Sequence, residues 1–374
     1  MNTERFFEKP DLWLYGHMSS IVEEKIRRSL DEYTHSYPHV SEGLRYRPKE
    51  NNLWTSAFYP GMAYLAYQRT KDPGFLRHAE DYLDSFTARL DKRNHISHDL
   101  GFLYILSSVA LYKLTGNERA KALAQRAADV LAERYNEKGK YIQAWGEMGI
   151  GHPDVKIIID TMLNLPLLYW SERKTHHVIA ENHAKTTAKY LIRDDFTSFH
   201  TYLMNPETGE AMCGRTHQGF RDESTWARGE AWAVYGFALS YSYTKNDEFL
   251  MAARECTRVF IENLPDNFVP YWDFAFTDKL PDIRDTSAAS IFLCGLLELC
   301  NWVDEAEAEQ YRRVVYTIVR SLYDHYFIHD PNNCGLLRES MYHRNGGANE
   351  CTAWGDYFFY EALVRLQGLW NRFW

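Results

Sequence analysis

Long hydrophobic runs are missing from this sequence of 374 residues. No stretch approaches the ~20 apolar residues of a membrane-spanning helix, so we predict no membrane partner. Met1 to Pro10 mixes charges with two phenylalanines and lacks the apolar segment of a signal peptide. The net charge is −9, and without a basic stripe for phosphates we predict no nucleic-acid partner. A small anionic ligand stays possible, because a local Arg or His cluster can set the sign inside a pocket.

Cysteine pairs and cofactor motifs are also missing. The six cysteines show no CxxC pair and no metal-ligand spacing, which predicts reduced thiols in a cytoplasmic protein. The chain has no GxGxxG, P-loop, HExxH or GxSxG motif. Its 15 histidines include no i,i+4 pair with a third carboxylate at metal-binding spacing. We therefore predict no metal and no cofactor, and the sequence gives no prediction of oligomeric state.

Helical periodicity, in contrast, extends along nearly the whole chain. We expect about twelve helices, which begin near residues 18, 57, 74, 100, 117, 160, 176, 225, 247, 286, 305 and 353. A repeat of ~45–70 residues pairs an apolar helix with a more polar one. The apolar helix should be buried all round, whereas the polar helix should expose one charged face. On this basis His176 and His177, at the start of a polar helix, should be solvated.

Six such pairs predict an all-α fold, an (α/α)6 barrel of six helical hairpins whose inner helices line the core. An open helical solenoid is the alternative. Solenoids usually carry charges on both helices of a pair, so closure is favoured. No linker rich in Pro, Gly or Ser divides the chain, which predicts a single catalytic domain over residues 1–374.

The connections before the expected inner helices are rich in Trp, His and Asp and longer than a helix turn requires. Gathered at one mouth of a barrel, they would line a single pocket. These connections are 95–99, 143–160, 200–228, 271–285 and 338–356.

Two aspartates occupy equivalent positions at the start of successive inner helices. Asp99 precedes an apolar helix, and Asp160 follows three isoleucines. The apolar setting should raise the pKa of Asp160, as a general acid requires. A helix N-cap is the structural alternative for each aspartate. Across a barrel mouth, one protonated and one ionised carboxyl would suit glycoside chemistry.

Arg228 lies between Trp226 and Trp232 on a helix that otherwise looks buried. A buried arginine needs an anionic partner. That partner is either an internal acid, such as Glu230 or Asp222, or the carboxylate of a substrate.

The same connections carry planar polar side chains that suit sugar hydroxyls and aromatic faces that suit sugar rings. Taken singly, each is more often a structural residue. These candidates are His98, His200, His217, Gln218, Trp54, Trp145, Trp232, Trp272 and Trp354.

Seven motifs follow one another along the chain in a distinctive order. They are HDLGFLY from His98, YIQAWG from Tyr141, IIIDTMLNLPLLYW from Ile157, THQGFRDESTWARGEAWAVYGFAL from Thr216, YWDF from Tyr271, RDTSAASI from Arg284 and WGDYFFYEALVRL from Trp354. Together they resemble the bacterial unsaturated glucuronyl hydrolases, glycoside hydrolase family 88. The resemblance extends over nearly the whole chain.

This resemblance implies an (α/α)6 barrel, and as substrate an oligosaccharide left by a polysaccharide lyase with a 4,5-unsaturated uronate at its non-reducing end. The implied reaction hydrates the C4=C5 bond. Asp160 takes the acid/base role, and Asp99 keeps it protonated. The residues implied to hold or enclose the sugar are Arg228, His200, His217, Gln218, Trp54, Trp145 and Trp232.

Two stretches depart from the pattern of the family. Ala57 and Tyr59 stand where the family commonly shows Gly and Trp, which we expect to reshape one wall of the site. Residues 345–353 lack the Ser- and Lys-rich segment of some relatives that act on sulfated glycosaminoglycans. We therefore expect a preference for unsulfated ends, or a different contact for sulfate.

Three alternative functions remain open. An unsaturated rhamnogalacturonyl hydrolase acting on pectin fragments would share the barrel and the aspartate pair. A sugar epimerase would use paired histidines, and a non-catalytic binding protein would keep the aromatic residues and lose the acid.

Overall fold

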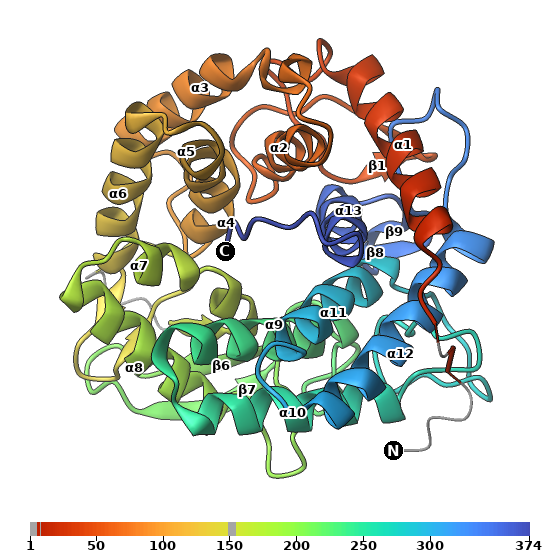
Figure 1. Ribbon diagram of the computed structural model, residues 1–374. Coiled ribbons are helices and arrows are strands. Elements are labelled where there is room, and N and C mark those ends of the chain that lie inside the picture. Colours follow the sequence, from red (N-terminus) through yellow and green to blue (C-terminus); the bar gives the residue numbers. More distant parts are fainter. Residues whose placement is uncertain (1–5, 8, 149–154) are drawn as a thin grey trace.

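The computed structural model describes residues 6–7, 9–148 and 155–374, and its helices form a closed ring (Figure 1). Within these residues, six inner segments alternate along the chain with six outer helices. The inner segments are α2 (Phe58–Thr70), α4–η2–α5 (Leu100–Tyr104, Ile105–Val109, Ala110–Thr115), η3–α7 (Ile159–Leu163, Pro166–Trp170), α9 (Ala227–Thr244), α11 (Thr286–Leu299) and α13 (Ala353–Leu366). The outer helices are α1 (Leu12–Ser29), α3 (Ala79–Asp91), α6 (Glu118–Ala132), α8 (Lys174–Tyr190), α10 (Asp247–Glu262) and α12 (Glu305–Ser321). The short helices η1 (Pro73–Leu76) and η4 (Leu322–Tyr326) complete the set. The barrel is confirmed, and the open solenoid is wrong.

Apolar composition places the inner helices inside the ring. α9 and α11 are buried along almost their full length, whereas α10 and α12 bury one stripe and expose the rest. Two glycines let neighbouring inner segments come into backbone contact. A Cβ atom on Gly236 would lie 2.3 Å from Cβ of Met162, and one on Gly101 would lie 2.2 Å from Cα of Asn164. The inner segments therefore hold one another at fixed distances.

The ring closes where α13 packs against α1 and α2. The hydroxyl of Tyr360 on α13 donates to Glu23 on α1 at 2.9 Å. Beyond α13 the chain turns into the barrel and ends in the middle of the ring (Figure 1). There the fully buried Trp374 stacks on Phe358 at 5.7 Å, and its Nε1–H donates to Glu361 at 2.7 Å. The tail thus fills one end of the barrel.

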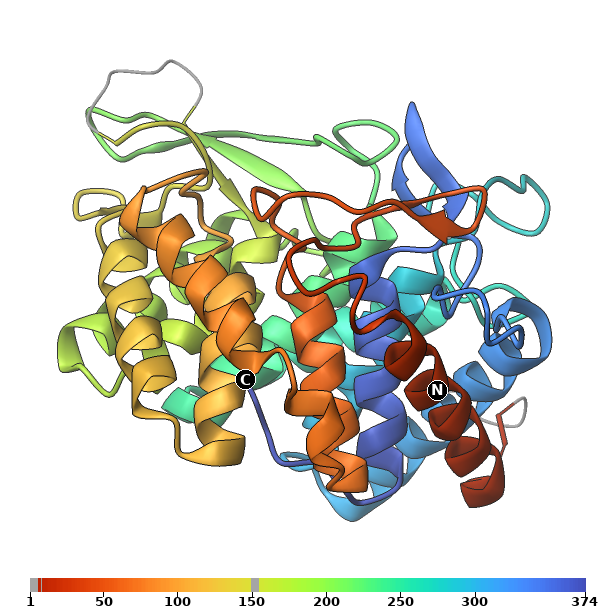
Figure 2. The same ribbon diagram turned by 90° about the horizontal axis from the view of Figure 1, so that it is seen from above.

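Short antiparallel strands lie at the opposite end, where the inner helices begin (Figure 2). All the described strands belong to connections that run from an outer helix to the next inner one. With two to five residues each, they are too short to show alternation in the sequence. They are β1 (Ser41–Glu42), β2 (Arg45–Tyr46), β3 (Tyr135–Asn136), β4 (Tyr141–Ile142), β5 (Lys156–Ile158), β6 (Thr201–Met204), β7 (Ala211–Arg215), β8 (Ser340–His343) and β9 (Gly346–Glu350).

The prediction that His176 is solvated is wrong. Its side chain is buried against the turn between α7 and α8, where Nδ1 lies 2.8 Å from the hydroxyl of Ser171. His177 is half-buried, with Nε2 2.9 Å from the carbonyl oxygen of Tyr169. The turn is too tight to leave either ring fully in water.

Two observations bear on the cytoplasmic location that the sequence predicts. All six cysteines are free thiols. Among the residues that the structure describes, no helix is both long and apolar enough to span a bilayer.

Two predictions concern residues outside the described part of the chain. The N-terminal stretch includes residues 1–5 and 8, and the connection 143–160 includes residues 149–154.

Candidate active site

Asp99 and Asp160 stand at the beginnings of two successive inner segments, α4 and η3. Neither carboxylate caps its segment by accepting a backbone N–H. Asp285, in contrast, caps α11 and accepts from the N–H groups of Ser287 and Ala288. The side chains of Asp99 and Asp160 are 13% and 15% exposed. The capping alternative therefore does not apply to either aspartate, and both carboxyls are left for another use.

The carboxyl of Asp160 has a raised pKa. Burial raises its pKa to about 7, with a further rise from Asp99 and an opposing effect of the Arg228 guanidinium. A carboxyl with this pKa is protonated in a large fraction of molecules at neutral pH. Its Oδ1 atom has no hydrogen-bond partner among residues 6–7, 9–148 and 155–374. Asp160 can therefore donate a proton to a bound molecule and take one back.

His200 faces Asp160 in a fixed tautomer. Its Nδ1 accepts the backbone N–H groups of His217 at 3.1 Å and Gln218 at 3.0 Å, so the ring hydrogen is on Nε2. Burial lowers the pKa of His200 well below its usual range, which keeps the ring neutral. Nε2 lies 3.9 Å from Oδ1 of Asp160 and has no partner within the described part of the chain. The pair can accommodate one substrate or water oxygen between two donors.

Arg228, in the first turn of α9, is anchored on several sides. Its guanidinium lies 2.7 Å from Asp285, donates to Gln218 at 2.7 Å and also bonds the carbonyl oxygens of Met341 and Tyr342. The group also lies over the rings of Trp226 and Trp354, at 4.4 and 5.2 Å. Such contacts hold a buried cation at one position.

The partner of Arg228 is an internal acid, as one of the two alternatives has it, but neither of the two acids given as examples is that partner. Glu230 accepts the backbone N–H of Ser198 at 2.8 Å, and Asp222 pairs with Arg215 at 3.0 Å. The observed partner, Asp285, is 57 residues away in the chain, and its position depends on how α9 and α11 pack. No local signal in the sequence points to it.

His98 lies behind Asp99 and is buried. Its Nδ1 is 3.0 Å from the hydroxyl of Thr161, and its Nε2 is 3.4 Å from Oδ1 of Asp99. Ser97 donates its hydroxyl to the other oxygen of Asp99 at 2.8 Å. Both ring nitrogens of His98 thus face protein groups, which leaves neither for the predicted sugar contact. Ser97 and Thr161 were missed in the sequence, although Ser97 directly precedes one of the motifs and Thr161 lies within another.

Two tryptophans offer surface at this end of the barrel. Trp145 is 36% exposed, and its ring centre lies 5.4 Å from that of His217. Trp54 is half-buried and lies 4.9 Å from Trp354. Both can serve as flat walls for a sugar ring.

The other three predicted tryptophans are packed inside. Trp232, between Phe102 and Phe358 at 5.3 and 5.4 Å, is fully buried, as is Trp354. The structure gives neither of them exposed surface for the predicted sugar contact, because the inner helices close over them. Trp272 is buried as well.

Tyr59 does not shape a wall of the site as expected. Its hydroxyl lies 2.7 Å from that of Ser29 on α1, and its ring packs against Tyr33. The side chain fills the space between α2 and α1. Ala57, beside it, is fully buried.

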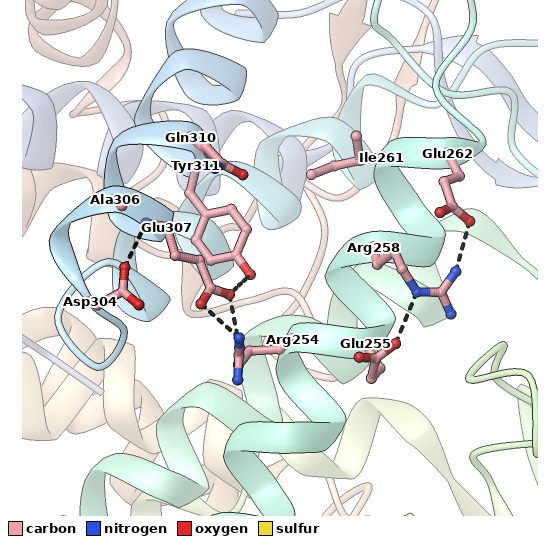
Figure 3. Close-up of a pocket in the computed structure, with 10 residues that line it drawn as sticks. All are labelled: Arg254, Glu255, Arg258, Ile261, Glu262, Asp304, Ala306, Glu307, Gln310 and Tyr311. Atoms are coloured by element: carbon pink, nitrogen blue, oxygen red, sulfur yellow. Dashed lines mark hydrogen bonds and ion pairs between the residues drawn. The ribbon is translucent and has the colours of Figure 1, made fainter. Parts of the chain in front are cut away.

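A separate cavity of about 810 Å³ lies between the outer helices α10 and α12 (Figure 3). Its charged side chains pair with one another, as Arg254 does with Glu307 at 2.8 Å and Arg258 with Glu262 at 2.8 Å. None of the predicted site residues lines it. Within the described parts of the chain, no group of three or more His, Cys, Asp or Glu side chains is arranged to hold a metal ion.

Comparison with known proteins identifies the family of this chain. The model of glycosyl hydrolase family 88 matches residues 25–365. The chain belongs to this family. It is therefore a glycoside hydrolase.

Similar proteins cover almost the whole chain. The unsaturated glucuronyl hydrolase of Bacillus sp. (strain GL1) is 40% identical over 91% of this chain and 93% of its own length. The unsaturated chondroitin disaccharide hydrolase of Streptococcus pneumoniae is 37% identical over 99% and 97%. The crystal structure of unsaturated glucuronyl hydrolase from Streptococcus agalactiae superposes with a TM-score of 0.95 at 34% identity, over 100% of this chain and 97% of that one. A variant of that enzyme, solved in complex with dGlcA-GalNAc6S, superposes with a TM-score of 0.88 at 32% identity, over the same shares of the two chains.

Proposed function

We propose that this protein releases 4,5-unsaturated glucuronic acid from the non-reducing end of glycosaminoglycan-type oligosaccharides produced by polysaccharide lyases. One observation carries the proposal. In the fold of family 88, Asp160 combines a raised pKa of about 7, to which the charge of Asp99 contributes, with an oxygen that has no hydrogen-bond partner among the described residues. The relatives named above are glucuronyl and chondroitin disaccharide hydrolases, which disfavours the rhamnogalacturonyl alternative.

The proposed reaction hydrates a vinyl ether. The Asp160 carboxyl donates its proton to C4 of the sugar, and positive charge develops at C5, stabilised by the ring oxygen. The negative charge of Asp99 further stabilises this cation. Water then adds to C5 and gives its proton to the Asp160 carboxylate. The resulting hemiketal opens, and the aglycone leaves as an alcohol.

The site also has features that suit an anionic sugar. The inner helices begin at this end of the barrel, so the positive ends of their dipoles lie around the aspartates. The Nε2–H of His200, 3.9 Å from Asp160, has no acceptor in the part of the chain that the structure describes. We propose that His200, His217 and Gln218 bind the uronate, and that Trp54 and Trp145 enclose it.

Substrate preference depends on the segment before α13. Residues 346–350 form β9, which pairs with β8 beside the site. Because this segment lacks the Ser- and Lys-rich pattern described above, we propose that unsulfated ends are preferred. Comparable turnover of sulfated and unsulfated chondroitin disaccharides would refute this preference. The six free thiols support our placement of the enzyme in the cytoplasm.

The decisive experiment mixes the protein with unsaturated disaccharides from chondroitin, heparin, hyaluronan, gellan and pectin. Hydration removes the conjugated double bond, so ultraviolet absorbance falls. We expect the absorbance to fall with the glycosaminoglycan disaccharides. If the absorbance falls with none of the substrates, the proposed function is refuted. Activity on the pectin disaccharide alone would favour the rhamnogalacturonyl alternative.

The role of Asp160 is tested by Asp160→Asn, which preserves shape and removes the acid. We expect activity to fall by at least ~100-fold while the substrate still binds. Asp84→Asn, on an exposed carboxylate of α3, is the matched control and should keep full activity. A near-wild-type rate for Asp160→Asn would assign the acid/base role to another residue. A series of His→Ala variants at 200 and 217 separates this mechanism from that of an epimerase, in which a histidine would be indispensable as the base.

A further inference from the structure

Two contacts join the segments that carry the catalytic aspartates. The side-chain oxygen of Asn164, four residues after Asp160, accepts the backbone N–H of Phe102 at 2.7 Å. The Nδ2 of Asn164 donates to the carbonyl oxygen of Asp160 at 3.2 Å. Close packing at Gly101 supports this joint, because a Cβ atom there would clash with the backbone of Asn164. The starts of α4 and η3 are therefore held together through their backbones.

The second contact runs through side chains. The hydroxyl of Thr161, next to Asp160, lies 3.0 Å from Nδ1 of His98. On the other side of the ring, Nε2 of His98 lies 3.4 Å from Oδ1 of Asp99. Thr161 and His98 thus span the distance between the two aspartates.

The protonation state of His98 determines which of its ring nitrogens can donate to Asp99 and which can accept from Thr161. Burial lowers the pKa of His98, with Asp99 opposing the shift and Arg134 adding to it, so the ring is neutral at pH 7. A neutral imidazole has one N–H and one acceptor nitrogen. A carboxylate can only accept, so the favourable tautomer has its hydrogen on Nε2, facing Asp99. Nδ1 then accepts the hydroxyl hydrogen of Thr161.

We propose that Thr161 and His98 are positioning residues for the reaction. The Thr161 hydroxyl selects the tautomer of His98, and the Nε2–H of that tautomer holds the Asp99 carboxylate opposite Asp160. This inference rests on the proposed function, since it supplies the second carboxylate that the hydration needs. It also assigns His98 a role behind Asp99 instead of against the sugar.

Among the described residues, the charged groups near Asp99 do not bond to Nδ1 of His98, so Thr161 determines which tautomer of His98 is favoured. Arg89 and Arg134 act on Asp99 from the side of α3 and α6, and Asp160 acts on it from η3. Arg134 donates to the carbonyl oxygens of Gln143 and Gly146, and Arg89 donates to the carbonyl oxygen of Leu53, so both guanidinium groups are directed at partners other than His98. The hydroxyl of Thr161 is the hydrogen-bond partner that the structure gives to Nδ1.

Thr161→Val tests the proposal, because valine keeps the shape and removes the hydroxyl. Histidine nitrogen NMR on the full chain reports which ring nitrogen of His98 carries hydrogen, with His98→Gln to assign its signals. We expect the Nε2–H form in the wild type and a mixture of tautomers in Thr161→Val. We also expect kcat on the preferred disaccharide to fall about tenfold, the equivalent of one hydrogen bond to a charged group, with KM within about twofold.

Thr161→Ser is the matched control, since it keeps the hydroxyl and loses only a methyl group. It should restore both the tautomer signal and kcat. An unchanged His98 signal in Thr161→Val would overturn the proposal, and so would a raised KM with unchanged kcat, which would mean that the pair contacts the sugar. The NMR measurement needs no substrate. Failure of the hydrogen-bond chain is therefore distinguishable from failure of the proposed function, which would appear as wild-type inactivity on every disaccharide.

Discussion

At the end of the barrel where the inner helices begin, Oδ1 of the buried Asp160 and Nε2 of His200 lack partners among the described residues. At the opposite, structural end, Glu361 is fully buried and has three partners. It accepts from Tyr235 at 2.7 Å and Trp374 at 2.7 Å, and it pairs with Arg365 at 2.9 Å. The two acids therefore differ in how completely their carboxyl oxygens are paired.

This difference in pairing indicates which acid is available for chemistry and which one stabilises the fold. A buried polar atom without a partner costs free energy, and it also remains available to a ligand. A buried acid that is fully paired contributes to the fold and has no oxygen left for chemistry. The pairing of the carboxyl oxygens, more than the type of residue, therefore distinguishes Asp160 from Glu361. The following predictions test this comparison.

Trp374→Ala should have the largest effect on stability. Removing a fully buried ring that stacks on Phe358 leaves a cavity at the structural end, and we expect a loss of about 4 kcal/mol. Because the ring packs on Phe358 and Phe102 and not on either aspartate, kcat/KM of the folded protein should change much less than its stability. Denaturant unfolding and the absorbance assay measure the two quantities. Trp13→Ala, on a side chain 73% exposed, is the control and should change stability by less than about 0.5 kcal/mol.

Glu361→Gln should destabilise the protein somewhat less. It leaves the buried Arg365 with Glu298, at 3.3 Å, as its remaining anionic partner, and we expect a loss of about 3 kcal/mol. Glu262→Gln on the exposed face of α10 should have little effect. Unfolding curves for both variants give the comparison. Equal stability of the two variants would mean that pairing at the structural end contributes little.

Asp160→Asn should stabilise the protein, and more so as the pH rises. In the folded state Asp160 keeps its proton up to about pH 7, whereas the unfolded chain releases it near pH 4. The wild type therefore loses stability from about pH 4 to pH 7, and above that range the cost is constant. The shift sets an upper limit of about 4 kcal/mol; with some water contact at the side chain we expect about 2 kcal/mol. Unfolding at pH 4 and pH 8 checks this, and a gain that is equal at both pH values would contradict it.

The rate should show the smallest change, a gradual dependence on pH. Since the proposed mechanism needs protonated Asp160, kcat/KM should fall about tenfold per pH unit above pH 7. A profile of kcat/KM against pH on the preferred disaccharide measures this decrease. A flat profile from pH 6 to pH 9 would show that Asp160 is not the proton donor.

The sequence predicted the helices and their alternation well, because apolar and charged faces are local patterns. It also located both aspartates, whose motifs lie at helix starts. It could not predict that Asp285 pairs with Arg228 or that His98 lies behind Asp99, since both contacts depend on how separate inner segments pack. Trp232 and Trp354 were assigned to the site because aromatic residues suit both sugars and cores, and only the packing shows them to be buried. The extent of a single domain over residues 1–374 stays a prediction.

Closure of the ring through α13 has a consequence for biosynthesis. α2 is buried on nearly all sides only when α13 packs against it, and the ribosome adds α13 nearly 300 residues later. At about 5–20 residues per second, the apolar surface of α2 waits about 15–60 s for its partner. During that time it is open to aggregation or to a chaperone. We therefore expect the yield of folded protein to depend on synthesis speed and chaperone supply more than on the stability of the finished barrel.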